Sequence, residues 1–154
     1  MDTNPVSESG VRPPQGGDSP PRMSGPLGDG PPVDLEALAG QICRQYREEF
    51  PDEQGRYGEA GFSWCVHDNQ HLLNWAVESV NGEFDIRHEV AWLANVLEAR
   101  EFPIDRLARA LDIGAAIVTL NLDGDAAREL AAVLIDTAMF VRSGAYVDYE
   151  PGGD

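Results

Sequence analysis

The segment 67–71, which reads HDNQH, holds the residue types whose spacing could support chemistry. Two histidines four residues apart share one face of a helix, and this arrangement can chelate a metal ion. A third ligand would come from His88 or Glu89 on the next predicted helix, because metal sites form between facing helices of a bundle. One hypothesis is therefore a metal-binding enzyme or sensor that uses His67, His71 and His88.

The same segment also fits a structural role without metal. On a helical wheel the core face of this helix holds Leu72, Leu73 and Ala76, and His67 falls opposite that face. His71 lies between the two faces, where a half-buried imidazole that is hydrogen-bonded to a neighbour needs no ligand. We favour this interpretation and expect no cofactor.

Aromatic residues form a second stripe beside the core face of the same helix. Large rings with one polar atom are common at protein interfaces and in ligand pockets, and also on a helix that is buried between two others. Both interpretations stay open, with core packing favoured. The candidate partner-binding or ligand-binding residues are Trp64, Asp68, His71, Trp75 and Trp92.

The composition excludes several classes of function. The chain has no lysine, and its eleven arginines face 27 acidic residues, which gives a formal charge of -16. A Walker phosphate loop and a Schiff-base enzyme both need a lysine amine. A nucleic-acid groove needs a dense basic stripe, and we expect neither nucleic acid nor membrane as a partner. Acid pairs such as Asp52–Glu53 fit a solvated surface better than general acid–base catalysis.

Three regions differ in composition. Residues 1–32 hold eight of the eleven prolines and few large apolar side chains, so we expect a disordered Pro/Gly-rich tail. Residues 33–145 are expected to form the helical domain, and residues 146–154 a frayed acidic C-terminal tail. Cys43 and Cys65 form no Cys-x-x-Cys pair, and no secretory signal is recognised, so we expect two free thiols in the cytoplasm.

Five segments show helical periodicity, and none shows the alternation of a strand. Their short connections favour antiparallel neighbours, which predicts an all-α fold, a compact four- to five-helix bundle. Gly114 lies on the apolar stripe of the fourth helix, where it would let a neighbouring helix approach closely. The expected helices are about 34–50, 63–80, 85–102, 104–120 and 126–143, with a polar loop at 51–62.

Apolar and polar residues between positions 65 and 110 recur in a recognisable pattern: Cys65, Asp68, His71, Leu72, Trp92, Leu93, Val96, Leu97, Arg100, Pro103 and Leu107, followed by Leu111. This pattern resembles a helical module of bacterial cobalamin-binding regulatory proteins, where it precedes the domain that binds vitamin B12. The chain lacks the Asp-x-His-x-x-Gly motif that provides the cobalt ligand in that class, so cobalamin binding does not carry over. The resemblance implies a helical regulatory or sensory module of a bacterium.

Together these features predict a non-enzymatic regulatory module that acts through a protein partner or through self-association. Apolar residues away from the core stripes, such as Met139 and Phe140, support this prediction because exposed apolar patches often mark partner sites. The alternatives are the metal site described above and a small-ligand sensor with a pocket lined by Trp64, Trp75 and Trp92.

Overall fold

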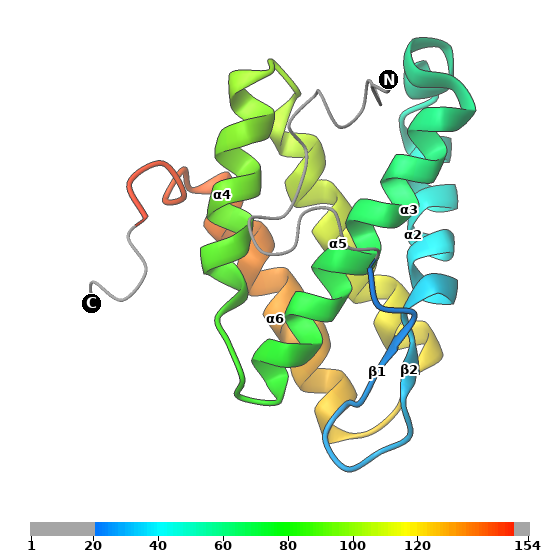
Figure 1. Ribbon diagram of the computed structural model, residues 1–154, viewed down its shortest axis with the longest axis vertical. Helices are drawn as coiled ribbons and strands as arrows, with labels where there is room; N and C mark the ends of the chain where they lie inside the picture. The colour runs from blue at the N-terminus through cyan, green and yellow to red at the C-terminus, as the bar shows by residue number, and fades with distance from the viewer. Residues whose placement is uncertain (1–20, 150–154) are drawn as a thin grey trace.

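The computed structural model describes residues 21–149, which form an all-α bundle of five helices with one pair of short antiparallel strands (Figure 1). The predicted fold class is therefore confirmed. None of the helices described is long and apolar enough to cross a lipid bilayer. The elements are β1 (Ser24–Gly25), β2 (Val33–Asp34), α2 (Leu35–Glu49), α3 (Asp52–Val80), α4 (Ile86–Ala99), α5 (Ile104–Asn121) and α6 (Asp125–Arg142).

Two of the helices begin next to aspartates that act as N-caps. The carboxylate of Asp34 accepts a hydrogen bond from the backbone N–H of Ala37 at 3.0 Å, and that of Asp85 accepts one from Arg87 at 2.9 Å. Each bond satisfies one backbone donor that a first helical turn leaves without a partner. Local chemistry thus determines where α2 and α4 start.

The core forms where α5 packs between α2 and α6. The apolar stripes predicted for these helices are almost entirely buried. At Gly114 a Cβ atom would lie 3.4 Å from Ile42 Cδ1 and 3.6 Å from Leu134 Cδ1, so α2 and α6 both approach α5 closely there. The predicted close approach at this glycine is confirmed.

The predicted loop at residues 51–62 is wrong, because α3 starts at Asp52 and extends to Val80. The helix is interrupted at Gly58, whose φ of 64° and ψ of -155° belong to a region that essentially only glycine adopts. The guanidinium of Arg47 on α2 donates to the Gly58 carbonyl at 3.2 Å and to the Gln54 amide oxygen at 2.7 Å. Contacts with α2 therefore hold this glycine-rich segment in helical form.

The boundary predicted for the N-terminal tail is also wrong. Residues 1–20 lie outside the described residues, but residues 21–32 pack on α3, and Leu27 is buried. Amides of α3 bind the backbone of this segment: Gln70 donates to the Arg22 carbonyl at 3.1 Å, and Asn81 donates to the Pro26 carbonyl at 2.8 Å. A segment with few apolar residues is thus ordered by hydrogen bonds to side chains distant in sequence.

The C-terminal tail was predicted to begin at Tyr146, but this residue is buried. Its hydroxyl donates to Glu98 at 2.8 Å, and its carbonyl accepts from the Asn95 amide at 3.1 Å. Both partners lie on α4, so the chain remains attached to the bundle beyond the end of α6. Residues 150–154 lie outside the described residues.

Candidate functional site

A cavity of about 450 Å³ opens between α3, α4 and α5. This volume lies within the range of about 300–1,000 Å³ that is typical of small-molecule pockets. Ala110 contributes little side-chain volume to its lining, which helps to keep the space open. The apolar walls come from all three helices and include Trp64, Leu72, Leu93, Leu97 and Leu107.

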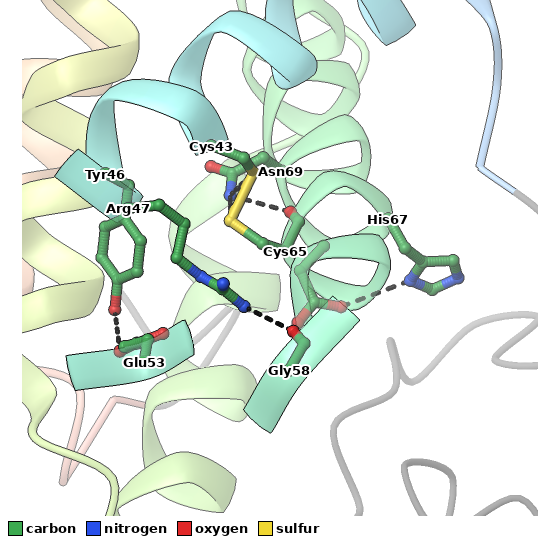
Figure 2. Close-up of a disulfide and its surroundings, with 9 residues drawn as sticks. Cys43, Tyr46, Arg47, Glu53, Gly58, Cys65, His67 and Asn69 are labelled. Atoms are coloured by element: carbon green, nitrogen blue, oxygen red, sulfur yellow. Dashed lines mark hydrogen bonds and ion pairs between the residues drawn. A yellow bond between two sulfur atoms is a disulfide. The ribbon is translucent and has the colours of Figure 1, made fainter. Parts of the chain in front are cut away.

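One end of the cavity holds a buried polar cluster. Figure 2 shows the Tyr46 hydroxyl directed at Glu53, to which it donates a hydrogen bond of 2.6 Å. Arg106 of α5 donates to the same carboxylate oxygen at 2.9 Å and to Asp52 at 3.1 and 3.2 Å. The guanidinium carbon of Arg106 also lies 4.3 Å from the ring centroid of Phe50, a cation–π contact. The cluster joins α2, α3 and α5 at this end.

These contacts shift the acidity of the groups involved. Burial raises the pKa of the Tyr46 hydroxyl far above its usual value, and the Glu53 carboxylate adds to this rise. The hydrogen bonds that Arg106 donates to the Asp52 carboxylate raise the pKa of Arg106. The phenol therefore stays protonated and the guanidinium stays charged, which favours a structural and electrostatic role for the cluster over proton transfer.

Asp68 is the second carboxylate of the cavity. Burial raises its pKa, and this rise is opposed by His67, whose Nδ1 atom lies 3.3 Å from the Asp68 carboxylate. Its side chain retains 27% exposure, so the carboxylate is screened from water but still accessible from the cavity. A carboxylate with a perturbed pKa in a concave site is a mark of functional positions.

The two histidines of the HDNQH segment belong to an aromatic row along α3. Ring centroids are 4.6 Å apart between Trp64 and His67, 4.8 Å between His67 and His71, and 5.9 Å between His71 and Trp75. Burial lowers the pKa of His71 to about 4, with a smaller contribution from His67. His71 is therefore neutral at pH 7. His67 was expected in solvent, but its side chain is only 24% exposed and contacts Asp68.

The structure does not bring the predicted metal ligands together. Within residues 21–149, no group of three or more His, Cys, Asp and Glu side chains is placed to hold a metal ion. His88 instead lies 3.8 Å from Glu89 on its own helix. The expected hydrogen bond of His71 is also missing at one ring nitrogen, because Nε2 is buried and has no hydrogen-bond partner among the described residues.

The candidate ligand-binding residues separate into two groups. Trp64 and Asp68 line the cavity, whereas His71, Trp75 and Trp92 do not. Trp75 is buried in the core, and Trp92 is partly buried against it. Trp75 thus follows the core interpretation of the aromatic stripe, and Trp64 has the position that a ligand contact requires.

Sequence reasoning missed the polar end of the cavity. The pair Asp52–Glu53 was taken as solvated surface, but Glu53 is only 6% exposed. Tyr46 is buried on α2, and nothing near it in the sequence indicates its partners. Arg106 lies 53 residues from Glu53, so the ion pair arises only when α5 packs beside the start of α3.

The cysteines are not free thiols, because Cys43 of α2 and Cys65 of α3 form a disulfide (Figure 2). Their Cα atoms are 6.0 Å apart, within the normal range for such a bond. The Asn69 amide donates to the Cys65 carbonyl at 2.9 Å and lies 3.5 Å from both sulfur atoms. Cys65 also lines the cavity, so the disulfide ties one cavity wall to α2.

Comparison of the chain with protein-family models, with curated proteins and with solved structures found no match.

Proposed function

We propose that this chain is a small-molecule-binding module of a regulatory or sensory kind, and that the cavity between α3, α4 and α5 is its binding site. The observation that carries the proposal is an apolar cavity of about 450 Å³ with charged groups at defined places in its lining. Such a combination is typical of ligand pockets, where apolar walls supply affinity and a few polar groups orient the ligand.

The resemblance to the helical module of cobalamin-binding regulators agrees with this proposal in one respect. Many residues that carry the resemblance lie on the cavity wall, from all three helices. They are Cys65, Asp68, Leu72, Leu93, Leu97, Arg100 and Leu107. That the chain belongs to this family stays a prediction, and so does its bacterial source.

The binding site is tested with the neutral fluorescent probe N-phenyl-1-naphthylamine, which responds to an apolar environment. We expect the folded protein to bind the probe and Ala110→Leu to weaken binding at least tenfold, because the added side chain fills the cavity. Ala116→Leu on the exposed face of α5 is the matched control and leaves binding unchanged. Equal binding by both variants would place the probe elsewhere and overturn the proposal.

A second candidate is the predicted binding of a protein partner or of a second copy. Met139 and Ile135 on α6 are 61% and 46% exposed. A more open hollow beside them is lined by Phe84, Val133 and Phe140. Light scattering during size-exclusion chromatography tests self-association, which Met139→Asp should abolish. A monomer at high concentration would count against it.

The cellular compartment is also a proposal. Cytoplasmic localisation was expected partly because both cysteines were taken as thiols, and the disulfide removes that support. Structural disulfides persist mainly in oxidising compartments. We propose that the chain works where the Cys43–Cys65 bond stays oxidised.

A further inference from the structure

The charges at the polar end of the cavity are not balanced. The lining includes two carboxylates, Glu53 and Asp68, and two guanidiniums, Arg100 and Arg106. Arg106 already binds both Asp52 and Glu53, so one positive charge faces two negative charges at that end. The polar cluster therefore has an excess of negative charge, and its cation is already engaged.

Asp68 has no arginine partner within the residues that the structure describes. Its only ion contact there is with His67 at 3.3 Å. Arg100 lines the same cavity but is exposed at the end of α4, and it makes no ion pair with Asp68. A carboxylate that is partly removed from water and lacks a permanent cation is strongly stabilised by a ligand that supplies one.

Aromatic side chains beside Asp68 fit the same ligand chemistry. Trp64, one helical turn before Asp68, lines the cavity together with Tyr57. Tryptophan and tyrosine rings attract cations through their electron-rich faces. The formal charge of -16 adds a long-range field that attracts cations and repels anions.

Resting on the proposed ligand-binding function, we propose that the cavity recognises an amphipathic amine, whose apolar body lies against Trp64 and Leu97 and whose protonated nitrogen binds Asp68. The carboxylate accepts hydrogen bonds from the ammonium group, and the aromatic rings lie beside the same charge. No covalent step is involved. Burial also keeps the pKa of Asp68 raised in the unliganded protein, so a bound cation relieves a cost that the empty site carries.

The test uses the full chain with its disulfide intact and three probes of equal length: 1-octylamine, octanoate and 1-octanol. We measure their dissociation constants by calorimetry at pH 7, where the amine is protonated. We expect octylamine to bind about tenfold or more tightly than the other two, as a charge-assisted hydrogen bond implies. Asp68→Asn should remove this preference and leave octanol binding unchanged.

The melting temperature shows whether Asp68→Asn still folds. Asp68→Asn is nearly isosteric and should raise the melting temperature at pH 7, because a neutral amide replaces a poorly solvated carboxylate. Asp136→Asn on α6 is the matched control and should change neither the preference nor the melting temperature. Trp64→Leu should weaken octylamine more than octanol, which reports the cation–π contribution.

The outcomes separate the two proposals. Equal affinity for all three probes overturns the amine assignment and leaves the cavity as a binding site. Preference for octanoate that disappears in Arg100→Gln would assign an anionic ligand instead and overturn the inference. If neither the three probes nor N-phenyl-1-naphthylamine binds, the proposed function itself fails.

Discussion

The α5–α6 hairpin and helix α3 bury different kinds of side chain in the same bundle. In α5 and α6 the buried residues are apolar apart from Thr137. Helix α3, by contrast, carries four of the six buried polar or charged residues within 21–149: Glu53, Asn69, Gln70 and Asn74. It also contains the break at Gly58 and one half of the disulfide.

Helix α3 therefore departs from the mainly apolar packing of α5 and α6. The hairpin gains its stability from burial of apolar side chains, and this effect does not depend on how the contacting groups are oriented. In α3 the buried polar groups each need a specific partner, because an unsatisfied one costs free energy. Glu53 and Asn69 contact α2, Glu53 also binds Arg106 of α5, and Gln70 binds the N-terminal segment. Glu53 and Asn69 also line the cavity. Helix α3 therefore connects the parts of the fold and provides both carboxylates of the cavity lining.

The largest change in stability is expected from a comparison of the hairpin core with the cavity wall. Leu134→Ala in α6 removes a fully buried side chain and should lower the free energy of unfolding by about 2–5 kcal/mol. Leu97→Ala at the cavity wall should cost roughly 1–2 kcal/mol, since this side chain is already partly exposed and borders open space. Urea unfolding of both variants measures the difference. Equal losses would mean that the cavity wall is packed as densely as the hairpin.

The disulfide gives the next largest effect. The two cysteines are 22 residues apart, and a loop of this length predicts a loss of about 3 kcal/mol when the bond is removed. The double variant Cys43→Ala, Cys65→Ala and the reduced wild-type protein should lose similar stability in urea. Alkylation without reductant provides the control: the folded protein should not react, and labelling of both thiols would contradict the bond.

The smallest expected effect concerns pH and His71. Its pKa of about 4 in the folded chain lies below the usual 6.5, so below pH 6.5 the unfolded chain binds a proton that the folded chain does not. Stability should therefore fall between pH 6.5 and 4, by on the order of 1 kcal/mol after allowance for partial solvent access. His71→Asn should flatten this slope, and the exposed His88→Asn should not. Denaturation at several pH values measures both slopes, and identical slopes in all three proteins would refute the assignment.

Most of the helical architecture could be predicted from local patterns. Apolar residues recur at helical spacing, and the caps at Asp34 and Asp85 depend on neighbours within three residues. The prediction failed at residues 51–62, where three glycines indicate a loop. Arg47 and the Glu53 cluster hold this segment in helical form, and such tertiary contacts overrule local propensity.

The site was only partly predictable. Trp64 and Asp68 were identified from their residue types and their place on α3, and both line the cavity. His71 and Trp75 lie on the same helix but do not line the cavity. Spacing along one helix could not predict this difference, because three helices form the cavity. Tyr46, Glu53 and Arg106 had no local signal, because their contacts join α2, α3 and α5.

Local pattern and composition were thus enough to predict the helices outside residues 51–62, the apolar face of each, and the chemistries that the lack of lysine excludes. These properties depend on residues within a few turns of one another or on composition. Only the tertiary structure decided that Cys43 meets Cys65, that Glu53 is buried against Arg106, and that Asp68 faces an open cavity. Each of these depends on how separate helices pack, and the apolar pattern that drives packing does not specify which polar side chains meet.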